Sequence, residues 1–179
     1  MGKLTGKVAI VTGAGGGLGR AHAMLLAHEG AAVIVNDLGG SRDGTGSGSS
    51  MADTVVDEIK AAGGQAAANY GSVTDDGAAE SMVKSAVDHF GRLDILINNA
   101  GILRDRSFKN MTDAEWDAVI DVHLRGSYLA TKHAWQQMMS QGEGGRIIMT
   151  SSTSGLIGNF GQANYGAAKA GVARFMRVL

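Results

Sequence analysis

Tyr165 and Lys169 are the two side chains whose types and spacing are best suited to chemistry. They stand four residues apart in the sequence YGAAK, so on a helix they lie on one face, about one turn apart. A phenol titrates near 10 and is a poor base at neutral pH, but a neighbouring ammonium favours the phenolate. The pair can therefore accept a proton from an alcohol. Because this spacing is common by chance, other motifs must support it.

A glycine-rich turn, TGAGGGLG at residues 12–19, follows an apolar run and precedes a helical one. Pyrophosphate binds to exposed backbone N–H groups and to the positive end of a helix, so side chains must be absent where the chain turns. Gly13, Gly17 and Gly19 meet that need. Placed between a strand and a helix, the turn indicates a dinucleotide site.

Asp37 ends the next apolar run, twenty residues after Gly17. A carboxylate at this strand tip can accept hydrogen bonds from both ribose hydroxyls of the adenosine half of a dinucleotide. Its charge also repels the 2′-phosphate of NADP, and the glycine turn contains no basic residue to compensate. The sequence therefore favours NAD over NADP as the cofactor, with Arg42 in the following loop as the one group that could reach a phosphate.

Short β-branched runs alternate with helical runs along the chain. Strands are expected at 7–12, 31–36, 93–98 and 146–151, with a weaker candidate at 65–69. Helices are expected at 17–29, 51–62 and 75–90. A further helix is expected to start at the capping box of Thr112 and Glu115 and to end at Val122. Another follows along a stripe that begins at Leu124, and the last begins at about residue 163. The nearly continuous apolar strands predict a parallel sheet covered on both faces. The fold class is α/β, a doubly wound Rossmann sheet in three α/β/α layers.

Two segments are open to more than one interpretation. Residues 39–50, GGSRDGTGSGSS, form either a flexible surface loop or a rim that closes over bound cofactor. The stripe on the helix after residue 122 indicates either core or a subunit interface, and its members are Leu124, Tyr128, Thr131, Trp135, Met138 and Met139.

The bulk composition excludes several classes of protein. The 179 residues suit one domain, 1–179, and 44% hydrophobic with 18% charged residues indicates a globular fold. A net charge of −1 without basic runs gives no reason to expect nucleic acid or a membrane surface as a partner. The absence of cysteine excludes disulfides and thiolate metal sites, and it is compatible with the cytoplasm, the expected location. We expect no metal site, signal peptide or membrane-spanning segment.

Taken together, the motifs resemble the short-chain dehydrogenase/reductase family. The glycine turn, the run Asn98-Asn99-Ala100-Gly101 after the fourth strand, Ser152 thirteen residues before the tyrosine, and the Tyr–Lys pair occur in the family's order. The resemblance extends from about residue 7 to the last residue. It implies a nicotinamide-dependent oxidoreductase.

The resemblance also implies a role for individual residues. Tyr165 would be the catalytic acid/base, Lys169 would lower its pKa and bind the nicotinamide ribose, and Ser152 would hold the substrate oxygen. Asn98 would partly brace the sheet. The residues implied in cofactor binding are Gly13, Gly17, Leu18, Gly19, Asp37, Ser72, Val73, Asn99, Ala100, Gly101, Tyr165 and Lys169.

Two positions depart from the family pattern. The family usually has an asparagine on the helix after the fourth strand, where it holds a water of the proton relay, and His123 stands there instead. Its ring could hold the same water, with a charge that depends on pH, or it could simply pack. An acidic residue often follows the third strand to meet the adenine; here Ser72 and the Val73 backbone would serve.

Three stretches, at 36–40, 99–108 and 122–126, are similar to one subgroup. It contains the (3R)-hydroxyacyl-CoA dehydrogenase domain of peroxisomal multifunctional β-oxidation enzymes and its bacterial relatives, and His123 is shared with it. This implies oxidation of an acyl thioester, (3R)-3-hydroxyacyl-CoA, to 3-oxoacyl-CoA by a homodimer or homotetramer. The alternatives are a 3-oxoacyl-ACP reductase or another short-chain alcohol dehydrogenase. Arg104 and Arg106 either attract the acidic substrate or belong to a solvated loop.

The expected last helix stops at Leu179 without a C-cap signal. Because members of the family continue through a further strand–helix section, we expect the fold to be C-terminally incomplete. The alternative from another class is therefore a non-catalytic fragment that binds nucleotide or forms oligomers.

Overall fold

The computed structural model describes residues 2–179 and contains one sheet of five parallel strands. Their order is β3-β2-β1-β4-β5. The strands are β1 Val8–Thr12, β2 Ala32–Asn36, β3 Gln65–Asn69, β4 Ile95–Asn98 and β5 Arg146–Met149. The predicted strands are all present, and the weak candidate at 65–69 is a full strand because it pairs along its whole length with β2.

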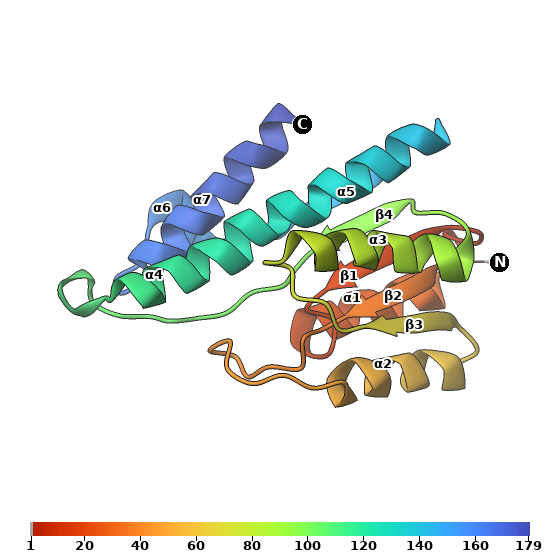
Figure 1. Ribbon diagram of the computed structural model, residues 1–179, viewed down its shortest axis with the longest axis horizontal. Helices are drawn as coiled ribbons and strands as arrows, with labels where there is room; N and C mark the ends of the chain where they lie inside the picture. The colour runs from red at the N-terminus through yellow and green to blue at the C-terminus, as the bar shows by residue number, and fades with distance from the viewer. Residues whose placement is uncertain (1) are drawn as a thin grey trace.

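Helices cover both faces of this sheet (Figure 1). The helices α1 Gly17–His28 and α2 Ser50–Ala61 pack on one face, where they share a core with alternate residues of β1 and β2, such as Val11 and Val33. The helices α3 Asp76–Phe90 and α5 Gly126–Gln141 pack on the other, against Ile10 and Ile34. Both faces of the central strands are therefore buried, which is why these strands are apolar throughout. The predicted doubly wound α/β class is confirmed.

The strand order reverses at β1, which has β2 on one side and β4 on the other. In open α/β sheets, ligands bind in the crevice outside the carboxyl ends of the strands at such a point. The two loops that leave β1 and β4 are joined there. The Thr12 hydroxyl accepts hydrogen bonds from the N–H groups of Asn99 and Ala100, each at 3.0 Å, and the Asn99 amide donates to the Thr12 carbonyl at 2.9 Å.

The helical region after β4 differs from the prediction in one respect. The capping box of Thr112 and Glu115 is present, and it opens α4 Asp113–Ile120. We expected this helix to end near Val122 and a second to follow. Instead the chain passes through a π-helical turn at Asp121–Arg125 directly into α5. Such turns keep the helix continuous while rotating its side chains, and they often occur at functional sites.

Three further elements complete the structure. The short helices η1 Phe108–Asn110 and α6 Thr153–Ile157 were not predicted, whereas α7 Ala163–Val178 begins where the sequence placed it. Helix α6 packs against α7, and α7 also contacts α4. No helix within residues 2–179 is both long and apolar enough to cross a bilayer.

The helical stripe on α5 divides between core and surface. Thr131 and Met138 are buried, whereas Tyr128, Trp135 and Met139 are exposed. Met138 belongs to the core beside α3, so for this residue the core interpretation of the stripe is the correct one. The helix turns one side of the stripe toward the sheet and the other toward solvent.

Candidate active site

The glycine turn forms a cradle that side chains would fill. A Cβ atom at Gly13 would lie 2.8 Å from the Ala100 Cα, and one at Gly19 would lie 2.0 Å from the Gly13 carbonyl oxygen. Gly13 and Gly17 also have φ angles of 63° and 51°, a region that only glycine enters freely. Helix α1 starts at Gly17 without a side-chain cap, so its first N–H groups remain available. The cradle fits a pyrophosphate group.

Asp37 lies beside this cradle at the carboxyl end of β2. One carboxylate oxygen accepts a hydrogen bond from the Gly15 N–H at 2.8 Å, and the other accepts from the Gly39 N–H at 2.7 Å. The carboxylate is only partly buried. Its remaining lone pairs are those with which it could bind ribose hydroxyls.

The loop that follows Asp37 crosses to the segment after β4 (Figure 1). The Leu103 N–H donates to the Arg42 carbonyl at 3.1 Å, and the Arg104 guanidinium donates to the Asp43 carbonyl at 2.9 Å. The loop residues themselves are exposed, yet these bonds tie the loop to the rim of the crevice. Arg104 is thus engaged by its own chain, and Arg106 is paired with Glu115 at 2.9 Å.

Ser72 and Val73 follow β3 at the same edge of the sheet. The Ser72 hydroxyl shares a hydrogen bond with that of Thr74 at 2.9 Å, and Val73 is buried beneath Gly126, whose added Cβ would approach it to 2.8 Å. The Asn36 amide fixes this segment by donating to the Gly71 carbonyl at 2.9 Å. The Asp37 N–H donates to the Asn69 carbonyl at 3.0 Å, so the segment after β3 lies beside Asp37.

Helix α7 presents Tyr165 and Lys169 on one face. The Lys169 Nζ lies 5.7 Å from the centre of the Tyr165 ring and donates a hydrogen bond to the Thr150 carbonyl at 2.6 Å. Only 4% of Lys169 is exposed, and burial lowers the pKa of its amine from 10.5 to about 8. The ammonium form still predominates at neutral pH.

Ser152 is positioned by α6, whose first turn it caps. Its hydroxyl accepts a hydrogen bond from the Ser154 N–H at 3.2 Å. Helix α6 approaches α7 so closely that a Cβ at Gly155 would lie 2.6 Å from the Ala170 nitrogen. The neighbouring Ser151 hydroxyl donates to the Lys169 carbonyl at 3.1 Å. These contacts hold the loop of Ser152 against the helix that carries Tyr165.

His123 lies in the π-helical turn and touches the Tyr165 ring edge-on, with 5.0 Å between ring centres and 88° between ring planes. Its Nε2 lies 2.8 Å from the Ile102 carbonyl oxygen and 3.2 Å from the Ile102 backbone nitrogen. The contact with the carbonyl is the shorter one, so Nε2 is assigned the proton. The buried Nδ1 has no partner among the described residues. Burial lowers the pKa of His123 to about 4, and the charge of Lys169 makes a smaller contribution in the same direction. The imidazole is therefore neutral near pH 7, and the pH-dependent charge that the sequence allowed for His123 falls at lower pH.

Asn98 joins β4 to α5. Its amide donates to the Thr131 hydroxyl at 3.0 Å and to the Met149 sulfur at 3.4 Å, which fits the bracing role implied by the sequence.

Two positions that sequence reasoning passed over also shape the site. Gly155 permits the approach of α6 to α7, and Asn164 is fully buried beside Tyr165. A polar residue directly before the tyrosine is visible in the sequence, but its burial is not.

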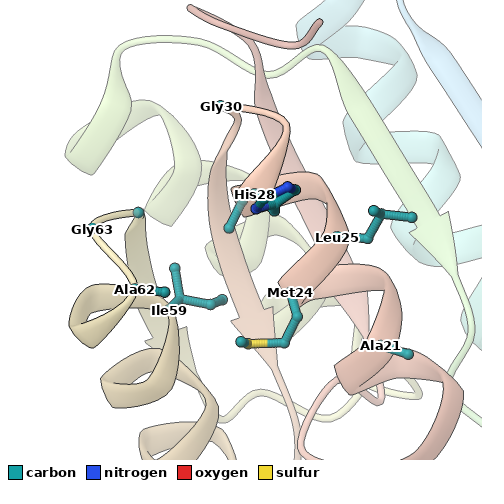
Figure 2. A pocket seen from close by; sticks show the side chains of 10 residues that line it. Ala21, Met24, Leu25, His28, Gly30, Ile59, Ala62 and Gly63 are labelled. Atoms are coloured by element: carbon teal, nitrogen blue, oxygen red, sulfur yellow. The ribbon is translucent and has the colours of Figure 1, made fainter. Parts of the chain in front are cut away.

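A separate hollow lies away from these residues (Figure 2). It is an open groove of about 580 Å³ between α1 and α2, on the side where β2 and β3 begin. Met24 and Ile59 extend toward each other across it, and His28 lies above them. The sequence-predicted catalytic residues are at the opposite, carboxyl edge of the sheet, so this groove is separate from the candidate active site.

The chain belongs to the short-chain dehydrogenase family, whose model matches residues 7–179. This confirms the family expected from the motifs.

Individual relatives are similar over nearly all of this chain. The mouse (Mus musculus) peroxisomal multifunctional enzyme type 2 is 59% identical over 95% of the chain, which corresponds to 23% of that protein. A hydroxyacyl-CoA dehydrogenase of Mycobacterium tuberculosis is 50% identical over 94% of the chain and 54% of its own length. The crystal structure of a short-chain dehydrogenase from Mycobacterium avium has a TM-score of 0.91 and 51% identity, covering 99% of this chain and 63% of that one. The chain therefore spans less than two thirds of each.

Proposed function

We propose that the chain oxidises (3R)-3-hydroxyacyl-CoA to 3-oxoacyl-CoA with NAD. The observation that carries the proposal is that Tyr165 and Lys169 share one face of α7, beside the neutral His123 ring and the Ser152 loop. The glycine cradle stands at the carboxyl edge of the same sheet. The acyl thioester is proposed from the name of the M. tuberculosis relative, a hydroxyacyl-CoA dehydrogenase, and from the three stretches of sequence similar to one subgroup of the family.

In this proposal, Tyr165 removes the hydroxyl proton of the substrate. Ser152 donates a hydrogen bond to the substrate oxygen and stabilises the charge that develops there. The Lys169 ammonium favours the phenolate of Tyr165 through its charge. Bound NAD supplies the hydride acceptor, and the protein contributes its placement.

His123 is proposed to support the proton transfer rather than to carry it. Its Nε2–H is engaged by the Ile102 carbonyl, so Nδ1 is left as an acceptor. A neutral acceptor in this position can hold a relay water without a charge that would compete with Lys169. The packing interpretation alone leaves the buried Nδ1 without a partner, which is costly.

The assay that tests the proposal presents 3-hydroxyacyl-CoA thioesters of both configurations with NAD and follows NADH formation. We expect oxidation of the (3R) thioester and none of the (3S) thioester. Turnover of free alcohols alone, or of 3-oxoacyl-ACP with NADPH in preference, would assign the chain to another reaction of the family. Binding of NAD without turnover of any of these would indicate the non-catalytic fragment.

Replacing Asp37 with serine is expected to reverse the choice of cofactor. The substitution removes the acceptor of the ribose hydroxyls and the charge that repels a 2′-phosphate. We expect kcat/KM with NAD to fall about 10–100-fold, since a hydrogen bond to a charged group contributes about 1.5–3 kcal/mol, and kcat/KM with NADP to rise. Asp57→Ser, at an exposed position of α2, should leave both values unchanged. A preference of the unsubstituted protein for NADP would contradict the role of Asp37.

We also propose a homo-oligomer with α5 in the interface. Trp135 and Met139 expose 41% and 64% of their surface on this helix and line one hollow together with Met176. Contiguous exposed apolar surface of this kind marks interaction sites. Light scattering gives the number of subunits, and a monomer at micromolar concentration would contradict the proposal.

A further inference from the structure

Asn164 is a polar side chain with no exposed surface, and it directly precedes Tyr165. Successive side chains on a helix point about 100° apart. Asn164 therefore faces the interior of the protein while Tyr165, which is only partly buried, faces the crevice. A fully buried amide in the first turn of the catalytic helix requires an explanation.

The hydrogen bonds of Asn164 join three elements. Its Nδ2 donates to the Arg104 carbonyl at 3.1 Å and to the Glu115 carbonyl at 3.0 Å. Its Oδ1 accepts from the Tyr165 N–H at 2.7 Å. Both amide hydrogens are used, and only a side chain with two donors and an acceptor can make all three bonds.

The partner Arg104 belongs to the segment that continues from the Asn99–Gly101 loop at the crevice. That segment also holds the loop from Asp37, because the Arg104 guanidinium donates to the Asp43 carbonyl at 2.9 Å. Asn164 thus connects the helix that carries the phenol to the part of the chain that borders the cofactor cradle. The second partner, Glu115, fixes α4 to the same point.

Other bonds between this segment and the start of α7 are more exposed to solvent. The Arg106 N–H donates to the Gly161 carbonyl at 2.8 Å, and the Gln162 amide donates to the Asp105 carboxylate at 2.9 Å. Arg106 and Asp105 are exposed, and Gln162 is half-buried. Bonds that compete with water hold geometry less firmly than a buried, fully satisfied network. Asn164 therefore makes the firmest link between this segment and the start of α7.

We propose that Asn164 is a positioning residue that sets where the Tyr165 phenol stands relative to the cofactor cradle. The inference rests on the proposed function, in which Tyr165 moves the proton. A displacement of about 1 Å at a reacting centre can cost about 100-fold in rate. Asn164 acts through Tyr165 and touches neither substrate nor cofactor.

The test is Asn164→Asp, which keeps the size of the side chain and the acceptor for the Tyr165 N–H. It replaces the donor by an oxygen that faces two carbonyl oxygens, so the start of α7 must move away from Arg104 and Glu115. We expect kcat, calculated per NADH-binding site, to fall about 10–100-fold. The KM for the thioester and the Kd of NADH should stay within about threefold of the parent. The deuterium isotope effect on kcat, measured with substrate deuterated at C3, should rise because hydride transfer becomes slower.

A purely structural role would give a different result. It would reduce the number of NADH-binding sites and leave kcat per site and the isotope effect unchanged, and that outcome would overturn the inference. Asn159→Asp is the matched control, because Asn159 is exposed and donates only to the Gln162 side chain, at 3.1 Å. If Asn164→Asp does not fold, Asn164→Ser removes both amide N–H donors without adding charge. The single hydroxyl hydrogen of serine cannot bond both carbonyls, so the same rate loss is expected.

A spectroscopic readout separates this inference from the proposed function. The chain has three tyrosines, so 13Cζ-tyrosine labelling gives a small set of resonances that Tyr→Phe variants assign. With NADH bound, Asn164→Asp should shift the Tyr165 resonance and leave those of Tyr70 and Tyr128 in place. If the parent oxidises no thioester, the proposed function fails while this measurement still decides the position of Tyr165. An unmoved Tyr165 resonance would refute the role of Asn164.

Discussion

Replacing Tyr165 with phenylalanine is expected to lower kcat about 100- to 10,000-fold, the range over which a positioned acid or base contributes. The substitution removes one oxygen and leaves the ring, whose edge-on contact with His123 has 5.0 Å between the ring centres. The fold and the cofactor cradle should therefore be unaffected. NADH fluorescence titration should give a Kd within about twofold of the parent, so the loss should appear in kcat.

Tyr128→Phe is the matched control for this prediction. Tyr128 is 49% exposed on α5, and its ring lies beside Phe175 with 6.3 Å between centres. The same atom is removed from the neighbouring helix, and kcat should not change. If Tyr165→Phe retained more than about one tenth of the parental kcat, the acid/base role given to Tyr165 would be wrong.

Replacing Lys169 with methionine is expected to abolish most activity while changing how stability depends on pH. The loss of the ammonium removes the charge that favours the phenolate, and kcat/KM should fall about 100-fold or more. The side chain is nearly buried, and its amine has a pKa of about 8 instead of 10.5. Below pH 8 the folded protein therefore keeps a charge in an environment that disfavours it.

The sign of the stability effect follows from proton binding. Between pH 8 and 10.5 the unfolded chain holds this proton and the folded protein has released it, so the contribution of Lys169 to stability rises with pH. The methionine variant lacks this titration. The free energy of unfolding of the variant minus that of the parent should be largest below pH 8. Above pH 8 this difference should decline by at most about 1.4 kcal/mol per pH unit.

Urea denaturation at pH 7, 8, 9 and 9.5 measures this difference directly. Lys60→Met, at an exposed lysine in the last turn of α2, serves as the control and should show no such trend. A constant difference between Lys169→Met and the parent across this range would mean that the Lys169 amine titrates normally in the folded protein.

The sequence alone determined the elements of this protein and the class of its chemistry. The capping box of Thr112 and Glu115 and the glycine turn depend on interactions among residues a few positions apart. Propensity, capping and the steric limits of φ act over that range. For the same reason, the face shared by Tyr165 and Lys169 could be predicted from helical spacing.

Only the tertiary structure decided how these elements meet. The contact of Gly13 with Ala100, the burial of Lys169, the π-helical turn that aims His123 at Tyr165 and the network of Asn164 each join residues far apart in the chain. Burial and partners depend on strand order and helix packing, which no local pattern specifies. The shifted pKa values of His123 and Lys169 follow from that burial, and thus they too are properties of the fold and not of the sequence motif.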